Sequence, residues 1–199
     1  MQAAWYESQG PARAVLEVGT LPAPRPGPGE VRVRVAVSAV NPVDVKRRLG
    51  GRGAMDGPRV VPHFDGAGVI DAVGEGVAPD RVGEHVWVYE AQWQRTAGTA
   101  AHWVVLPQRL AVPLPTAREP SLLPAGQAIA VGPLLAAGAC LGIPALTAYQ
   151  CVYDGGPVTG QLVLVTGGAG AVGNYAVQFA RLGGAMVIAT ASSDEKAER

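Results

Sequence analysis

Six residues from Gly168 to Gly173 carry the clearest chemical signal, because they read Gly-Ala-Gly-Ala-Val-Gly, a GxGxxG pattern. In such a loop the first glycine allows a tight turn, the second lets the backbone approach a pyrophosphate, and the third lets the helix pack near the strand. The N-terminus of the following helix favours the phosphate charge. The same glycines could instead form an ordinary turn between a strand and a helix. On the first interpretation, the cofactor-binding residues here are Gly168, Gly170, Ala171, Val172 and Gly173.

The segment that follows the next apolar run bears on the choice of coenzyme. NAD enzymes usually place an Asp or Glu about 20 residues beyond the glycines, where it holds the ribose hydroxyls. Here the segment reads Thr190-Ala191-Ser192-Ser193, with Lys196 shortly after it. Hydroxyl groups and one cation suit a 2′-phosphate, so we predict NADPH as cofactor, with Ser192 and Lys196 as contacts. The alternative is that either serine only caps a helix and that Lys196 is a solvated charge.

Metal and nucleophile chemistry find little support in the sequence. The three histidines and two cysteines are scattered, and neither cysteine lies in a CxxC pattern or near a histidine: His63, His85, His102, Cys140 and Cys151. Zinc sites need ligands at closer and more regular spacing. No glycine-flanked turn carries a serine at its centre, as a nucleophile elbow would. We therefore predict no bound metal.

The first 115 residues contain short strands that must position any site in that part of the chain. Val31–Val37 reads VRVRVAV, in which the valines alternate with residues of the opposite face, Arg32 and Arg34 among them, and this predicts a half-buried strand. Asn41 followed by Pro42 is a typical helix start, and Gly50 is the matching stop, so we expect a short helix over Asn41–Leu49. Further strands are predicted at Gly68–Val73, His85–Tyr89 and His102–Leu106. This pattern favours a small β-barrel or a partly open sheet.

From about Leu122 the composition becomes rich in Ala, Leu and Gly. Ala136–Val152 reads as a helical region interrupted by Pro144. Two apolar runs, Gln161–Thr166 and Met186–Thr190, flank the glycine loop and its helix, and we expect both to be strands buried on both faces. The result is one β-α-β unit followed by the beginning of another helix. We therefore predict two domains, residues 1–122 and residues 123–199.

Composition excludes several functional classes. The chain has 199 residues, of which 48% are hydrophobic, and a formal net charge of zero. That length allows a core in one domain or two small ones. Balanced charge without a basic block argues against a nucleic-acid partner. No apolar run approaches the ~18 residues of a membrane-spanning helix, and the first residues lack the pattern of a signal peptide. Two isolated cysteines fit a reducing cytosol, so we expect a cytoplasmic protein.

Five motifs in order resemble the medium-chain dehydrogenase/reductase superfamily. They are Gly27-Pro28-Gly29-Glu30-Val31, Asn41-Pro42-Val43-Asp44, Asp65-Gly66-Ala67-Gly68-Val69-Ile70, Leu146-Thr147-Ala148-Tyr149 and the glycine loop. Within that superfamily the chain is similar to the zinc-independent quinone oxidoreductase (zeta-crystallin-like) branch. The resemblance implies an α/β plus β architecture, with a GroES-like β-barrel substrate domain followed by a Rossmann domain. It also implies NADPH-dependent hydride transfer to quinones or to carbonyl-conjugated double bonds, and a homodimer at full length.

The resemblance further implies which residues would serve catalysis. It places Asn41 and Thr147 beside the nicotinamide, while Asp44 and Lys46 would face the cleft from the short helix. Asn41 could also act as the helix cap, and Lys46 could be a solvated charge beside Arg47 and Arg48. Zinc-dependent relatives carry Cys near the first motif and Gly-His-Glu before the Gly-Ala-Gly. Here His63 is one residue out of step with that histidine.

The end of the sequence departs most from the family. A doubly wound cofactor domain uses two β-α-β-α-β halves, whereas this sequence stops after two predicted strands. We expect either a truncated product or a naturally short relative, with impaired catalysis because Val163, Val165, Val187 and Ile188 would lack cover. Two rival functions remain open at this point: a non-catalytic nucleotide-binding or oligomerising fragment, and an enoyl reductase module of a larger synthase.

Overall fold

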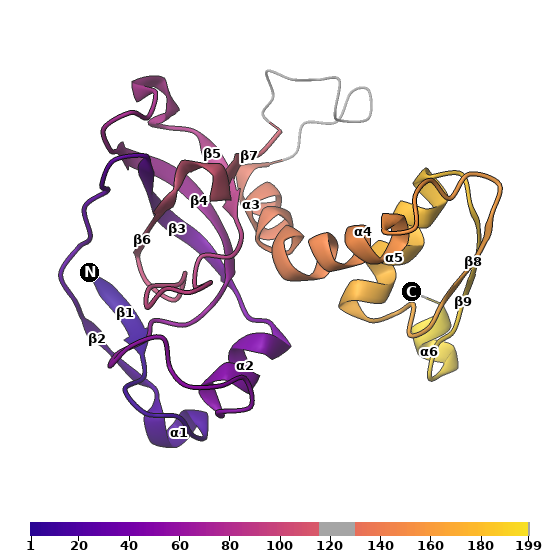
Figure 1. Ribbon diagram of the computed structural model, residues 1–199, viewed down its shortest axis with the longest axis horizontal. Helices are drawn as coiled ribbons and strands as arrows, with labels where there is room; N and C mark the ends of the chain where they lie inside the picture. The colour runs from indigo at the N-terminus through magenta and orange to yellow at the C-terminus, as the bar shows by residue number, and fades with distance from the viewer. Residues whose placement is uncertain (116–129, 199) are drawn as a thin grey trace. The chain divides into compact units, whose positions relative to one another are not determined.

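The computed structural model describes residues 1–115 and 130–198 (Figure 1). It divides into two compact units, Met1–Gly142 and Ile143–Arg199. The predicted domain boundary between residues 122 and 123 lies outside the described residues. The observed division lies further along the chain, after Gly142, because the helix α3 (Val131–Ala139) packs against three strands of the first unit, β3 (Glu30–Ala39), β4 (Asp65–Val73) and β5 (His85–Val88). Apolar contacts of Leu135 and Ala139 with Ala67 and Leu114 hold it there.

The first unit is built around a five-stranded antiparallel sheet with the order β6-β3-β4-β5-β7. A separate hairpin pairs β1 with β2. The strands are β1 (Gln2–Trp5), β2 (Glu17–Thr20), β3 (Glu30–Ala39), β4 (Asp65–Val73), β5 (His85–Val88), β6 (Trp103–Pro107) and β7 (Ala111–Pro113). The other elements are the helices α1 (Ala12–Val15) and α2 (Pro42–Arg48) and the short 3-10 turns η1 (Pro79–Arg81) and η2 (Gln108–Leu110).

Alternation along β3 explains why this sheet forms. Val31 and Val33 are completely buried, while Arg34 on the other face is exposed. The core beneath them includes Ile70, Val86, Val88, Val104 and Leu106. Register shifts between β3 and β4 occur at Arg32/Val33 and again at Val35/Val37, and such bulges bend a strand and increase its twist. The predicted strands and the helix after Asn41 are confirmed, with shifts of a few residues at their ends.

The second unit contains the predicted β-α-β unit. Its elements are α4 (Leu146–Tyr153), β8 (Leu162–Val165), α5 (Ala171–Leu182), β9 (Met186–Ala189) and α6 (Asp194–Ala197). The strands β8 and β9 pair in parallel, with Leu162 opposite Met186 and Val165 opposite Ala189. The interruption predicted at Pro144 is a π-helical turn, η4 (Leu141–Ala145), before α4.

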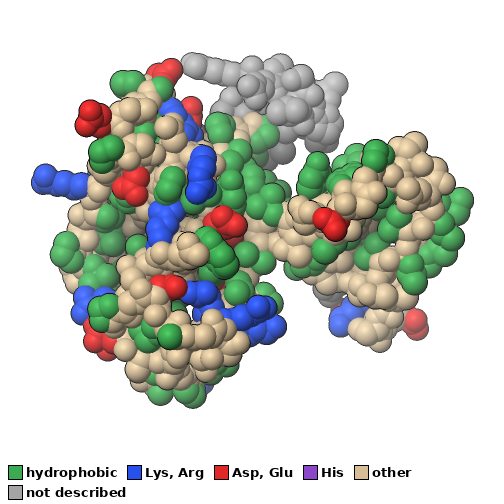
Figure 2. Space-filling view, in the orientation of Figure 1, with side chains coloured by type: hydrophobic (Ala, Val, Ile, Leu, Met, Phe, Trp, Pro, Cys, Tyr) green, Lys and Arg blue, Asp and Glu red, His purple; other side chains and the backbone are tan. Residues whose placement is uncertain are grey.

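The prediction that both strands are buried on both faces is wrong in this structure. The helix α5 packs against one face of the pair, where Val165, Val163 and Val187 join Ala148 and Ala176 in a cluster. On the other face Leu162, Leu164, Met186 and Ile188 are 63%, 63%, 71% and 52% exposed. Figure 2 shows hydrophobic side chains along the edge of the view where β8 and β9 lie. Of the four residues expected to lack cover, Val165 is buried, Val163 and Val187 are half-buried, and Ile188 is exposed.

None of the described helices is alone long and apolar enough to cross a membrane. The segments Val131–Ala139 and Leu141–Tyr153 together meet that length and composition as a bent pair.

Candidate functional site

The start of α2 places Asn41 and Asp44 side by side. Asn41 lies at the N-cap position in an extended conformation, and Pro42 is the first helical residue. The Asp44 carboxylate reaches back, so that its Oδ2 accepts a hydrogen bond of 2.6 Å from the Asn41 backbone N–H. This is the second half of a capping box. The Asn41 side chain forms the other half of the box toward the Asp44 backbone, and its Nδ2 also donates to Asp65 Oδ2 at 2.7 Å.

Burial changes the role expected for Asp44. The residue is only 4% exposed, so it does not face an open cleft, as the sequence analysis expected. Burial raises the pKa of the Asp44 carboxyl to about 6, although hydrogen bonds from the backbone of Asn41 and Phe64 and the charge of Arg47 oppose the rise. In the structure the Asp44 carboxylate caps the N-terminus of α2 and holds the Asn41 backbone in place. Lys46, two residues further along α2, is exposed to solvent.

Asp65 was not predicted as a site residue, although it begins the third family motif. It is completely buried at the start of β4, and a Cβ added at Gly142 would lie 2.1 Å from its Oδ1. The Gly142 backbone therefore packs directly against the Asp65 carboxylate, which holds the Asn41 amide, and leaves no room there for a side chain at position 142. An acidic residue at the first position of a buried strand, before Gly-Ala-Gly, is the signal that could have identified it.

A chain of hydroxyl groups runs from Asp65 to His63. The Thr99 Oγ1 donates its one hydrogen to the Asp65 carbonyl oxygen at 2.6 Å, so it must accept from the Ser38 hydroxyl, 2.8 Å away. Ser38 has then no hydrogen left for His63 Nδ1 at 2.9 Å, and the imidazole must donate. Burial lowers the pKa of His63. The neutral ring therefore carries its hydrogen on Nδ1 and leaves Nε2 as an acceptor.

The glycine loop of the second unit joins β8 to α5. The residue with the left-handed backbone is Gly167, at φ +69°, rather than Gly168, to which the sequence analysis assigned the tight turn. Gly168 is required for another reason, because a Cβ there would lie 2.8 Å from the Ala189 Cβ. Gly173 permits the close packing expected of the third glycine, since its added Cβ would lie 2.1 Å from the Gly167 carbonyl oxygen.

Thr190, which was not among the predicted site residues, connects this loop to the end of β9. Its Oγ1 accepts a hydrogen bond from the Gly167 N–H at 3.1 Å, and its carbonyl oxygen accepts one from Gly168 at 2.8 Å. A hydroxyl residue directly after the second apolar strand was the available signal. The contact fixes the loop against the segment that contains Ser192.

A cavity of about 370 Å³ lies between the glycine loop and the end of β9. Among its lining residues Lys196 is the charged one, and the others are Gly167, Ala169, Gly170, Thr190, Ala191 and Ser192. The Lys196 Nζ lies 3.0 Å from the Ser192 Oγ, so the structure brings these two predicted contacts together. Ser193 acts as the N-cap of α6 and accepts from the Lys196 N–H. The helix-cap alternative thus holds for Ser193.

The predicted site residues are divided between the two units. Gly170 is the N-cap of α5, and Ala171, Val172 and Gly173 form its first turn. Thr147 is exposed in the first turn of α4. Asn41, Asp44 and Lys46 belong to the first unit. Within residues 1–115 and 130–198, no group of three or more His, Cys, Asp or Glu side chains is placed to hold a metal ion.

Comparison with known proteins supports both units. Residues 27–116 match the alcohol dehydrogenase GroES-like domain. The chain is 34% identical over 167 residues to 2-methylene-furan-3-one reductase of Solanum lycopersicum, a match that covers 81% of this chain and 39% of that protein. It is 30% identical over 157 residues to quinone oxidoreductase of Rattus norvegicus, covering 78% and 42% respectively. Zinc-type alcohol dehydrogenase-like proteins of Staphylococcus aureus also match, at 30% identity.

A solved mycobacterial structure complexed with NADPH covers 100% of this chain, with a TM-score of 0.74 and 27% identity, and this chain covers 54% of it. The chain thus spans about 40% of the length of the two curated relatives above. The antiparallel sheet of the first unit is followed by a parallel β-α-β unit with a glycine loop, an arrangement that is also found in dinucleotide-binding folds.

The predicted resemblance to the medium-chain dehydrogenase/reductase superfamily is confirmed, and residues 27–116 match its GroES-like domain. The predicted resemblance to quinone oxidoreductases is confirmed. Independence from zinc stays a prediction, as does the cytoplasmic location.

Proposed function

We propose that this chain supplies the substrate domain and the coenzyme-binding β-α-β unit of an NADPH-dependent oxidoreductase. It reduces quinones or carbonyl-conjugated double bonds, works without zinc, and acts in the cytoplasm as a homodimer. The names of the tomato reductase and the rat quinone oxidoreductase support the reaction class. The single observation that carries the coenzyme assignment is the contact between Lys196 and Ser192 at the rim of the glycine-loop cavity.

The residues around this cavity fit a phosphorylated ribose. Its volume of about 370 Å³ is within the usual range of about 300–1,000 Å³ for small-molecule sites. Side chains are nearly absent from the loop, and a Cβ at Gly170 would already approach the Gly167 carbonyl oxygen to 3.2 Å. The lining set contains a lysine and two hydroxyl side chains but no carboxylate. An anion would therefore meet donors and a cation rather than a like charge.

Different residues of the chain would bind the coenzyme and orient the substrate. Lys196 and Ser192 hold the 2′-phosphate, and the first turn of α5 favours the pyrophosphate charge. NADPH, when bound, would supply the hydride. Asn41 and Thr147 orient the reacting partners. One N–H of the Asn41 amide is engaged by Asp65, which fixes the plane of the amide and leaves its second N–H for a ligand. Lys46 is proposed to polarise the substrate oxygen.

Binding measurements test the coenzyme assignment directly. We expect the wild type to bind NADPH at least tenfold more tightly than NADH in isothermal titration calorimetry, because a charge-assisted hydrogen bond contributes about 1.5–3 kcal/mol and ~1.4 kcal/mol is tenfold. Lys196→Ala should remove most of that preference and leave NADH affinity unchanged. Arg181→Ala removes a positive charge from the exposed end of α5 and should have no comparable effect. Equal affinity of the wild type for both coenzymes would refute the assignment.

A further inference from the structure

One end of the five-stranded sheet collects three segments that are distant in sequence. Ala39 at the end of β3 pairs with Asp65 at the start of β4, and Gly66 pairs with Val88 at the end of β5. The segments that follow β3 and β5 and the segment that precedes β4 therefore lie at the same end of the sheet. Asn41 belongs to the first of them. This end of the sheet is where we propose that the substrate is held.

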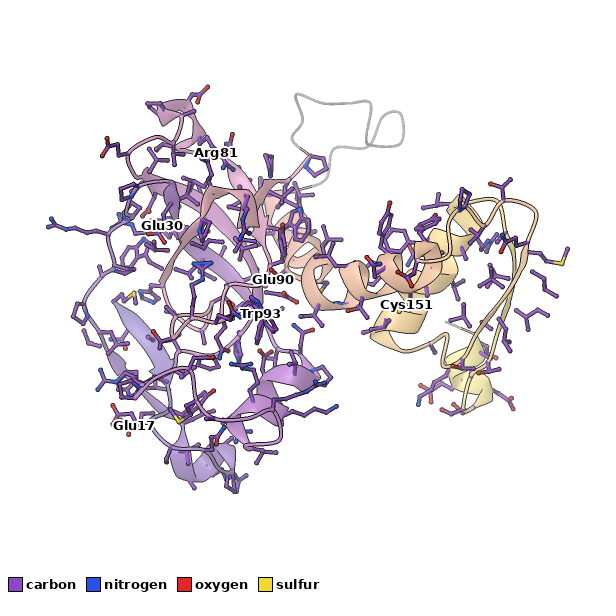
Figure 3. The ribbon with its side chains drawn as sticks, viewed as in Figure 1. Glu17, Glu30, Arg81, Glu90, Trp93 and Cys151 are labelled. Atoms are coloured by element: carbon purple, nitrogen blue, oxygen red, sulfur yellow. The ribbon has the colours of Figure 1, made fainter. Side chains whose placement is uncertain are left out.

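The loop after β5 is anchored against this sheet end. The Ala91 N–H donates to the Phe64 carbonyl oxygen at 2.9 Å, directly before Asp65. Ala91 and Gln92 are almost completely buried, whereas the next residue, Trp93, is 54% exposed. The Trp93 N–H closes a turn by donating to the Glu90 carbonyl oxygen at 3.0 Å. Figure 3 shows Glu90 and Trp93 close together on this loop.

The backbone on both sides of Trp93 is in an unusual conformation. Glu90 and Gln94 have φ of +51° and +54°, a left-handed region that residues other than glycine rarely adopt. Such conformations persist where the surrounding structure fixes them, and they cluster at functional sites. Here the buried Ala91 and Gln92 fix the loop, and the result is that a large aromatic ring is held toward solvent rather than packed in the core.

Val40, which precedes Asn41, is a second apolar side chain exposed at this sheet end, at 65%. Single exposed apolar residues are common. Exposing a tryptophan is less favourable, because its apolar surface in water is large, and its ring offers a large, rigid face for stacking. A flat, apolar, electron-poor ring is the ligand that matches such a face. An acyclic enone offers a smaller and less planar surface.

We propose that Trp93 is a specificity-determining residue that stacks on the ring of a planar quinone, so that the site favours quinones over acyclic enones. This inference rests on the proposed function and narrows its substrate class. The stacking needs no covalent step. Its strength should depend on an aromatic ring at position 93 rather than on the indole N–H.

The test is ligand binding to the 199-residue chain by calorimetry. The probe is 2,3-dimethyl-1,4-naphthoquinone, because its two ring methyl groups block addition of the exposed thiols of Cys140 and Cys151. The acyclic comparison ligand is 4-methylpent-3-en-2-one. The variants are Trp93→Ala, the aromatic replacement Trp93→Phe, and the control Val18→Ala, which truncates a 79% exposed side chain on β2.

We expect Trp93→Ala to raise the Kd of the naphthoquinone about tenfold, because the variant loses the aromatic face on which the ligand ring stacks. Trp93→Phe should retain most of the affinity, Val18→Ala should retain all of it, and the Kd of the enone should change less than about twofold. An unchanged quinone Kd in Trp93→Ala, equal losses for both ligands, or no saturable quinone binding by the wild type would overturn the inference. Failure of the proposed function is a separate result: a wild type that binds the quinone but binds NADPH no more tightly than NADH.

Discussion

Asp44 shows how burial decides what one side chain can do. Its carboxyl pKa is raised from 3.8 to about 6, mainly by burial, so folding favours the neutral form. The stabilising contribution of this group is therefore fully present below about pH 3.8 and is lost as the pH rises through 6. A shift of about two units corresponds to roughly 3 kcal/mol at ~1.36 kcal/mol per unit.

We predict that Asp44→Asn, which keeps an oxygen acceptor for the Asn41 N–H, removes the fall in unfolding free energy between pH 4 and pH 7 that this group causes. Urea unfolding at several pH values measures it. Asp154→Asn, at an exposed carboxylate near the end of α4, is the control and should leave the pH profile nearly unchanged. Identical profiles for the wild type and Asp44→Asn would contradict the prediction.

At the scale of elements, the β8–α5 connection depends on Gly173 more than on helix propensity. Alanine is favoured over glycine in a helix by about 1 kcal/mol, but a Cβ at position 173 would lie 2.1 Å from the Gly167 carbonyl oxygen, a backbone atom. We predict that Gly173→Ala lowers the melting temperature and abolishes NADPH binding, because the loop must open. Gly132→Ala in α3, where an added Cβ meets nothing within 4 Å, should be neutral or stabilising. Equal melting temperatures of both variants would contradict this.

Local sequence rules succeeded where the determining interactions were local. The Asn-Pro start and Gly50 stop predicted α2, and valine alternation predicted β3, because capping and periodicity act within one element. They missed contacts between distant segments. The sequence marks Asp65 and Thr190 by their positions beside strands, but no spacing indicates that Asp65 holds the Asn41 amide or that Thr190 holds Gly167. The GxGxxG rule selected the right loop but assigned the tight turn to Gly168, whereas the left-handed residue is Gly167, whose N–H is held by Thr190 after β9.

At the scale of the whole chain, the two faces of the β8–β9 pair differ in what covers them. Val165 is 8% exposed beneath α5, whereas Leu164 and Ile188 on the other face are 63% and 52% exposed. Contiguous exposed apolar side chains bind hydrophobic ligands and other surfaces. We predict that the double variant Leu164→Thr, Ile188→Thr lowers the fluorescence of a bound hydrophobic dye such as ANS, with little change in unfolding free energy. Threonine keeps the β-branched shape that strands favour.

The matched control for this last prediction is Val165→Thr, the same kind of change on the covered face of the pair. A hydroxyl buried there without a partner costs about 1–3 kcal/mol, so this variant should lose stability without lowering dye fluorescence. Opposite responses of the two variants would show that α5 covers one face of the sheet in solution as it does here. If the double variant lost as much stability as Val165→Thr, the outer face would be packed against something in solution, and its assignment as exposed would be wrong.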